Sequence, residues 1–522
     1  MRRLASLLLA SAIALAGLPA AHAADAAPAN ASSSATHDST DPRIPAHETA
    51  VRTQHSVAIG GRTIRYTATA GTVIIRDDKQ QPQASVFYVA YTVDDGKPSQ
   101  RPLTFLYNGG PGSSSVWLHM GSLGPVRIET ASPQATAPAP YHLVANGDSL
   151  LDKTDLVFID AVGAGYSRPL GKATGKDFWG VDQDISAFSR AIERYVTLNR
   201  RWNSPKFLYG ESYGTTRSAA LVDALQDKGM AFNGVILMSS ILNYAIRMPG
   251  YDESYVGYLP SFAAAAWYHD KVPSKSGQNK PAELKAFVDQ ARAWARGPYA
   301  SALALGQDLP AAQFDAIATQ MAGFTGLPVQ YIKQANLRVS PSRFRKELLR
   351  DQRLILGRYD ARFTGTDPDA AGETPEYDPS DTGISGAFVS AFHDYLADQL
   401  DYPSQLDYRP TYGKIIQGWD WKHAVPGMRR ALPLPYVAGD LAHAMRTNPN
   451  LKVLSLNGYY DFATPFFITE YDLAHMNLDP SLRGNLSFAY YPSGHMIYLN
   501  TEALQQLKHD LARFYDLAAP QR

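Results

Sequence analysis

The 522-residue sequence contains no cysteine. Disulfide bonds, a thiol nucleophile, a cysteine-ligated zinc site and a lipid anchor on cysteine are therefore all excluded. An exported chain of this size without disulfides must be stabilised by its core alone, and 45% of its residues are hydrophobic.

The sequence also has no excess of positive or negative charge, because 49 Lys and Arg residues balance 49 Asp and Glu residues. A nucleic-acid partner would need a basic surface, so none is expected. Neither an H-E-x-x-H motif nor a phosphate-binding loop occurs, and we expect no metal and no cofactor. After the first residues no apolar run approaches the ~20 residues of a membrane span, so stable membrane insertion is not expected.

The first 23 residues have the pattern of an export signal. Two arginines precede an apolar run over residues 4–18, and Ala21-His22-Ala23 has the form of a cleavage site. We expect a bacterial protein exported to the periplasm or secreted, with residues 1–23 as signal peptide. Residues 24–53, rich in Ala, Ser, Thr and Pro at their start, are expected to be a disordered leader.

Short continuous apolar runs recur along the chain, with helical patterns between them. The runs cover residues 103–107, 155–159, 206–209, 234–239 and 451–456. Continuous runs are typical of strands covered on both faces, and their alternation with helices predicts a parallel sheet. Alternating strands between residues 56 and 92 are expected to add an antiparallel edge. The predicted fold class is α/β, a mixed, mostly parallel sheet flanked by helices, as in an α/β-hydrolase.

The strand runs stop between residues 248 and 434, where helical periodicity takes over. We predict an α/β-hydrolase core made of residues 54–247 and 435–522, with residues 248–434 inserted as a mainly helical cap. An independent domain is the alternative for this segment.

The stretch around residue 212 predicts a nucleophile. The apolar run at 206–209 ends in G-E-S-Y-G at residues 210–214, and a helical pattern begins at Thr216. Strand, tight turn and helix in this order form the setting of a nucleophile elbow, which presents a serine hydroxyl to a cleft. Ser212 is therefore the candidate nucleophile. An ordinary Gly/Ser turn is the alternative.

A serine nucleophile needs a base, and the base needs an acid that orients it. In α/β-hydrolases the chain order is Ser, then Asp or Glu, then His. Asp461 lies in the loop after the run at 451–456, and His495 follows Gly494 in the loop after the last predicted strand. We predict these two residues as the acid and the base. A turn aspartate and a packing histidine are the alternatives.

Four motifs in this order resemble the serine carboxypeptidase family. They are N-G-G-P-G-S-S-S at 108–115, D-A-V-G-A-G-Y-S at 160–167, G-E-S-Y-G at 210–214 and G-H-M at 494–496. The resemblance covers about residues 56–243 and 432–514, and the lack of disulfides suits a bacterial-type member. It implies cleavage of C-terminal residues from a peptide substrate through an acyl-enzyme, without a cofactor.

The resemblance also implies roles around the triad of Ser212, Asp461 and His495. The oxyanion hole would be formed by the backbone N–H groups of Gly110 and Tyr213. Asn108 and Glu211 would hold the carboxylate of the substrate.

Glu211 can bind an anion only in its protonated form, which a shared buried site with another carboxylate would favour at acid to neutral pH. Ser122 occupies a position where better-known members have a second glutamate. An esterase or acyltransferase with the same triad therefore remains an alternative, as does a non-catalytic binding protein on this scaffold. The sequence indicates no oligomeric state.

Overall fold

The structure is a computed structural model that describes residues 38–272 and 283–519. The predicted signal peptide and residues 24–37 of the predicted leader lie outside the described residues. The end of that leader needs a correction, because strand β1 (Thr49–Ile59) begins inside it. This strand pairs with β2 along its whole length, and it lacks an apolar run because its first residues are alternately half-buried and exposed.

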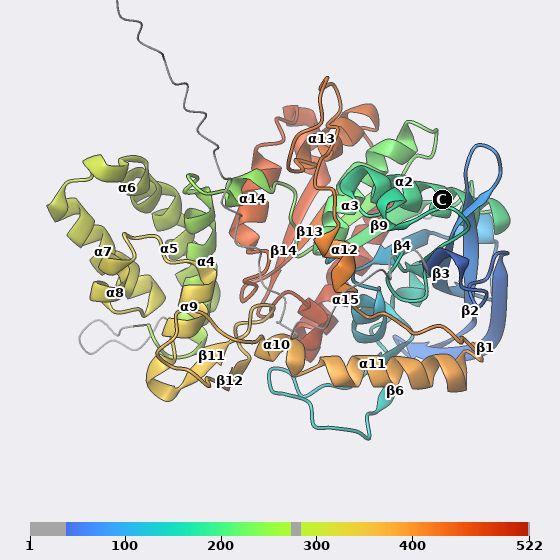
Figure 1. Cartoon of the computed structure of the whole chain (residues 1–522), viewed down its shortest axis with the longest axis horizontal. Helices are drawn as coiled ribbons and strands as arrows, with labels where there is room; N and C mark the ends of the chain where they lie inside the picture. Colours follow the sequence, from blue (N-terminus) through green and yellow to red (C-terminus); the bar gives the residue numbers. More distant parts are fainter. Residues whose placement is uncertain (1–37, 273–282, 520–522) are drawn as a thin grey trace, which may run out of the picture. The chain divides into compact units, whose positions relative to one another are not determined.

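The protein is built on a ten-stranded sheet in the order β1-β2-β3-β7-β4-β9-β10-β13-β14, with β8 paired to β3 (Figure 1). Neighbours are antiparallel from β1 to β7 and parallel from β7 to β14. The remaining strands of this sheet are β2 (Arg62–Arg76), β3 (Pro82–Val93), β4 (Leu103–Tyr107), β7 (Asp155–Ile159), β8 (Arg168–Pro169), β9 (Lys206–Glu211), β10 (Gly234–Met238), β13 (Lys452–Gly458) and β14 (Leu486–Tyr491). The predicted mixed, mostly parallel sheet is confirmed.

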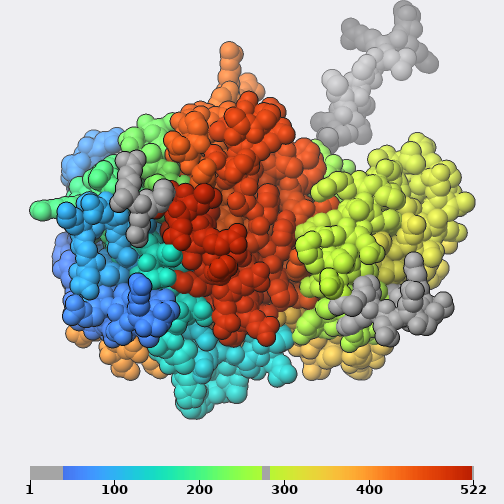
Figure 2. Space-filling view, turned by 180° about the vertical axis from the view of Figure 1, so that it is seen from behind, coloured from blue at the N-terminus to red at the C-terminus, as the bar shows by residue number. Residues whose placement is uncertain are grey.

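Helices cover both faces of this sheet. Successive residues of one strand enter different cores: Phe105 packs with α2, α3 and α13, whereas Leu106 packs with α11 and α15. The C-terminal residues, in the darkest red, lie on the surface that Figure 2 shows. The helices and small strands outside the insertion are α1 (Val116–Leu118), β5 (Val126–Ile128), β6 (Leu143–Ala145), α2 (Val181–Leu198), α3 (Tyr213–Gln226), α13 (Ala438–Thr447), α14 (Phe466–Ala474) and α15 (Thr501–Ala518). This arrangement is an α/β-hydrolase fold.

The segment from 248 to 434 is mainly helical, and it packs in two different ways. Helices α4 to α9 build a core of their own with the loop after β13. Residues 384–408 instead pack into the main core, where Phe388 contacts Trp117 with ring centroids 5.3 Å apart. The elements are α4 (Glu253–Tyr268), α5 (Leu284–Trp294), α6 (Ala300–Ala304), α7 (Ala311–Thr325), α8 (Val329–Gln334), α9 (Pro341–Glu347), β11 (Leu354–Leu356), β12 (Thr364–Thr366), α10 (Pro379–Thr382), α11 (Ser385–Asp394) and α12 (Gly413–Gln417). The insertion is therefore joined to the hydrolase core rather than being a separate domain.

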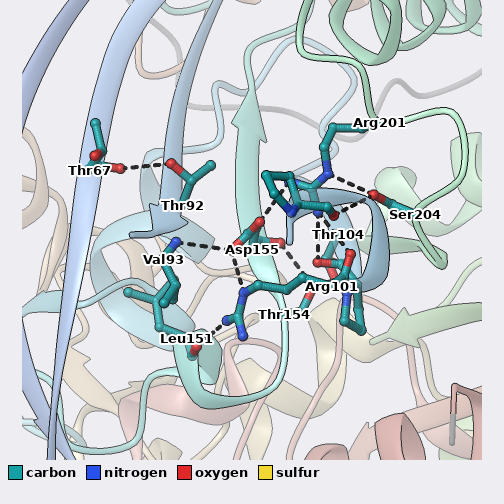
Figure 3. A network of polar contacts seen from close by, with 12 residues as sticks. Thr67, Thr92, Val93, Arg101, Thr104, Leu151, Thr154, Asp155, Arg201 and Ser204 are labelled. Atoms are coloured by element: carbon teal, nitrogen blue, oxygen red, sulfur yellow. Dashed lines mark hydrogen bonds and ion pairs between the residues drawn. The ribbon is translucent and has the colours of Figure 1, made fainter. Parts of the chain in front are cut away.

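Figure 3 shows a buried charge network at the start of β7. The Asp155 carboxylate accepts hydrogen bonds from Arg101 Nε at 2.6 Å and from Arg201 Nη1 at 2.7 Å (Figure 3). The N–H of Val93 donates to the same carboxylate at 3.1 Å. These residues lie at the amino ends of the parallel strands, opposite the carboxyl ends at which ligands bind in open α/β sheets. The network therefore ties the sheet together away from the site.

Among the described residues, none of the helices combines the length and the apolar character that crossing a bilayer would require.

Candidate active site

Ser212 occupies the sharp turn between β9 and α3. Its backbone has φ 61° and ψ −129°, a strained conformation for a non-glycine residue. The turn is too tight for side chains on either side: a Cβ at Gly210 would lie 2.1 Å from the carbonyl of Gly214, and one at Gly214 would lie 2.8 Å from that of Tyr107. The predicted strand, turn and helix are all present.

Asp461 and His495 meet beside this turn, each in the loop that follows one of the last two strands of the sheet. His495 Nδ1 lies 2.8 Å from Asp461 Oδ2, and both side chains are buried. The same carboxylate accepts hydrogen bonds from the N–H of Thr464 at 2.9 Å and from its hydroxyl at 2.8 Å. Burial lowers the pKa of His495, but the carboxylates of Asp461 and Glu211 together outweigh this effect and the pKa is raised overall. The imidazole is thus oriented as a base requires.

The nucleophile turn is joined to the loop of His495 through the end of β10. The N–H of Ser212 donates to the carbonyl of Met238 at 3.0 Å, and the hydroxyl of the next residue, Ser239, donates to the carbonyl of His495 at 2.6 Å. Within the described part of the chain, the Ser212 hydroxyl makes no hydrogen bond. The contact between nucleophile and base commonly tightens only when substrate binds, so this geometry is compatible with a triad.

The two backbone amides that the sequence predicts as an oxyanion hole belong to two segments that meet, the loop after β4 and the start of α3. Tyr213 is the first residue of α3, so its N–H has no intrahelical acceptor. The loop after β4 runs against it: a Cβ at Gly109 would lie 2.4 Å from the nitrogen of Tyr213. Gly110 follows with φ 107°, a conformation that favours glycine. This corner can accommodate a developing oxyanion.

A buried ion pair supports the loop after β4, residues 108–115, which we call the oxyanion loop. Arg217, on α3, donates to Asp184 on α2 at 2.7 and 3.2 Å, and to the carbonyl of Asn108 at 2.9 Å. Its guanidinium also lies 4.0 Å from the ring centroid of Phe188. No sequence pattern indicates this pair, because its partners lie on different helices.

Glu211 is a buried carboxyl adjacent to the nucleophile. Tyr498 donates its hydroxyl to Glu211 Oε2 at 2.9 Å. Burial raises the pKa of Glu211 to about 7, although the charge of His495 and hydrogen bonding by Tyr498 and Asn108 lower it. Asn108 uses its Oδ1 to accept the N–H of Leu118 at 2.9 Å. Burial is thus the main cause of the raised pKa, and the second carboxylate, Asp461, adds a weaker effect than the sequence predicts.

Ser122 does not replace the missing glutamate with another polar contact. Its hydroxyl is buried and has no hydrogen-bond partner among the residues described. Its carbonyl accepts a hydrogen bond from Asn146 Nδ2 at 2.6 Å, which fixes the backbone. Ser122 therefore adds no contact to the predicted pair of Asn108 and Glu211, whereas Tyr498, which no sequence pattern indicates, contacts Glu211.

A part of the insertion also covers the oxyanion loop, which the sequence did not indicate. The N–H of Ser114 donates to Pro410 O and that of Tyr412 to Gly112 O, both at 2.9 Å. Trp419 packs edge-on against the ring of Tyr213 at 5.2 Å. This side of the site is therefore walled by aromatic side chains. Among the residues that the structure describes, no group of His, Asp or Glu side chains is arranged to hold a metal ion.

Comparisons with known proteins agree with the motifs. The model of the serine carboxypeptidase family matches residues 64–288, which include Asn108, Gly110, Glu211, Ser212 and Tyr213. The acid and the base lie beyond the matched part, so their assignment rests on the geometry above. No curated protein matches the chain.

Solved structures resemble the chain only weakly. A proline iminopeptidase from Mycobacterium smegmatis is 13% identical, with 90% of this chain and 99% of that chain covered and a TM-score of 0.35. A thermostable carboxyl esterase from Bacillus coagulans is 11% identical, with 85% and 96% covered and a TM-score of 0.33. The fold is therefore assigned from the strand order of the sheet, and not from these similarities. Residues 64–288 therefore match the serine carboxypeptidase family, and the strand order of the sheet is that of an α/β-hydrolase fold.

Proposed function

We propose that this serine hydrolase is a serine-type carboxypeptidase, which removes residues from the C-terminus of a peptide through an acyl-enzyme on Ser212. His495 takes the proton of the Ser212 hydroxyl as the oxygen attacks the scissile carbonyl, and Asp461 stabilises the imidazolium. The N–H groups of Gly110 and Tyr213 donate to the oxyanion. His495 then protonates the leaving amine, and the same base activates the water that releases the acyl group.

The observation that carries the exopeptidase proposal is the buried carboxyl group of Glu211 next to the nucleophile. With a pKa of about 7 it is protonated at acid pH and donates a hydrogen bond instead of repelling an anion. Asn108 acts on the same carboxyl and can supply a second donor through its side-chain amide. The two side chains form a receptor for the terminal carboxylate of the substrate.

The unpartnered hydroxyl of Ser122 favours an esterase or acyltransferase as the second candidate. Without a second glutamate, fewer groups hold the carboxylate, and a neutral acyl substrate needs none of them. A non-catalytic binding protein is disfavoured, because it would need neither the His495–Asp461 contact nor the two free amides.

Peptides that differ only at the C-terminus test the exopeptidase proposal. We would incubate N-blocked peptides with a free or an amidated C-terminus and follow their masses over time. The proposal expects stepwise loss of C-terminal residues from the free acids only, because the amide offers no anion to Asn108 and Glu211. Equal cleavage of both series would contradict it, whereas turnover of simple esters alone would support the second candidate.

We expect the peptidase activity to fall as the pH rises above about 7, because Glu211 then ionises. Its pKa is about 7, so the neutral, donating form is present below that pH and is lost above it. In Glu211→Gln the side chain cannot ionise, and kcat/KM for free-acid peptides should lose this alkaline decline. A wild-type kcat/KM that climbs steadily to pH 9 would refute the role of Glu211, and an ester substrate without a carboxylate serves as the control.

We also propose that the protein is exported. The support is the apolar run behind two arginines and the Ala21-His22-Ala23 site in the sequence. N-terminal sequencing of protein from the periplasm or the medium should give Ala24 as the first residue.

A further inference from the structure

Five residues of the insertion, 358–362, lie across the loop of the candidate acid. We call this segment the clip. The N–H of Phe462 donates to the carbonyl of Arg358 at 3.0 Å, and the N–H of Ala361 donates to the carbonyl of Tyr460 at 3.0 Å. These two bonds are formed by the residues on either side of the acid, so the clip pairs with the backbone that positions it.

The clip is joined to the loop of the candidate base as well. The N–H of His495 donates to the carbonyl of Tyr359 at 2.6 Å, and the ring centroids of the two side chains lie 5.3 Å apart. From the other end of the clip, Arg362 Nη2 donates to Ser493 Oγ at 3.3 Å. The insertion therefore holds the base loop both by its backbone and by a side chain.

Gly494, which precedes the base, allows this close approach. A Cβ at this position would lie 2.4 Å from Asp360 Cβ and 2.4 Å from the carbonyl of Tyr359. Gly494 does not have a positive φ, so its backbone conformation suits any residue. The glycine is needed because the clip touches it.

The clip itself is held rigidly within the insertion. Arg362 forms an ion pair with Asp360 at 2.6 Å, and both side chains are nearly fully buried. His269, which follows α4, contacts the carbonyl of Ala361 at 2.7 Å, and Ser380 of α10 accepts the N–H of Tyr359 at 3.0 Å. A segment fixed by its own ion pair and by two helices can transmit a defined position to the loops.

We propose that Arg362 is a positioning residue for the base, so that the insertion completes the triad instead of only covering it. Through Asp360 and Ser493, the guanidinium keeps the base loop at the distance that the bond from His495 to Asp461 requires. This proposal rests on the proposed function, because it takes His495 as the base.

Labelling of Ser212 with a fluorophosphonate tests the clip without any peptide. The reaction needs the nucleophile and the base but not the carboxylate-binding residues. In Arg362→Met the second-order labelling rate should fall by about 10- to 100-fold, because a base displaced by a fraction of an ångström transfers its proton poorly. Arg362→Lys, which keeps the charge, should restore part of the rate. If the wild-type chain does not react, the result contradicts the proposed function and does not bear on the role of Arg362.

Lys346→Met is the matched control. Lys346 and Asp367 form another buried ion pair of the insertion, at 2.6 Å and with side-chain exposures of 1% and 0%. Among the described residues, no hydrogen bond or ion pair joins this pair to the loops of the acid and the base. Lys346→Met should therefore lower Tm at least as much as Arg362→Met while the labelling rate stays within about twofold of wild type.

The pH dependence of labelling gives a readout that a purely structural role would not change. The Asp461 carboxylate raises the pKa of His495, as does Glu211 to a smaller extent, whereas Arg358 of the clip lowers it. When the base loop shifts in Arg362→Met, the Asp461 carboxylate raises the pKa of His495 less. The acid limb of the pH–rate profile of labelling should then move to lower pH. An unchanged acid limb with an unchanged rate would overturn the proposal, and so would an equal loss of rate in Lys346→Met.

Two smaller changes replace Arg362→Met if that variant does not fold. Ser493→Ala removes only the hydroxyl that accepts from Arg362, and Gly494→Ala inserts a methyl group between the loop and the clip. Both should slow labelling, and Gly494→Ala should slow it more because its methyl group has no space. Wild-type rates in both folded variants would refute the proposal.

Discussion

Replacing Ser212 by alanine should lower kcat/KM by about 10⁴- to 10⁶-fold while the chain stays folded. The loss is large because no other group can form the acyl-enzyme, and the base, acid and oxyanion amides act only together with the nucleophile. The chain stays folded because Ser212 Oγ makes no hydrogen bond within the described residues, and alanine keeps the Cβ of the turn.

Steady-state kinetics and fluorophosphonate labelling measure this effect, with circular dichroism as the check on folding. Ser261→Ala is a suitable control. Its hydroxyl, on α4, likewise has no hydrogen-bond partner among the described residues, but it is buried and lies in the insertion. It should leave kcat/KM unchanged. If Ser212→Ala retained more than about a hundredth of the activity, the nucleophile would have to be another residue.

The central sheet could be predicted because its strands are buried on both faces. Leu103–Tyr107 and Gly234–Met238 are fully buried, which demands the continuous apolar runs seen in the sequence. The edge strand β1 has no such run, because its first residues face solvent in alternation, and its start was therefore assigned to the leader. A run of apolar residues therefore reveals a strand only where both faces of that strand are buried.

The candidate triad has a different signal in the sequence, namely the order of its residues along the chain. Ser212, Asp461 and His495 each follow a strand at the carboxyl edge of the sheet, and the order of the three residue types is fixed in this fold. The clip and the Arg217–Asp184 pair had no such signal. Arg362 contacts a serine 131 residues away, and no local pattern records that distance.

Removing one partner of the Arg217–Asp184 pair should destabilise the protein strongly. Asp184→Ala leaves the Arg217 guanidinium buried, at 1% side-chain exposure, without its counter-charge. Breaking a buried pair in this way costs about 3–5 kcal/mol of the free energy of unfolding, because the remaining charge stays desolvated. The cation–π contact at 4.0 Å to Phe188 offsets only part of this cost.

The loss should extend to activity, because Arg217 also holds the oxyanion loop. Its Nη1 donates to the carbonyl of Asn108, which lies two residues before Gly110. In Asp184→Ala the guanidinium loses the carboxylate that fixes its orientation, and its hydrogen bond to that carbonyl is weakened. We expect kcat to fall together with stability, and KM for free-acid peptides to rise because the Asn108 amide is displaced.

Chemical denaturation of three variants separates the charge effect from packing. Asp95→Ala removes an exposed pair, in which the side chains of Arg65 and Asp95 are 69% and 76% exposed, and should cost less than about 1 kcal/mol. The double variant Asp184→Leu with Arg217→Met replaces both charges by apolar groups and should recover most of the stability lost in Asp184→Ala. It should not recover kcat, since no donor then reaches the carbonyl of Asn108. A double variant less stable than Asp184→Ala would show that shape, rather than the unpaired charge, sets the cost.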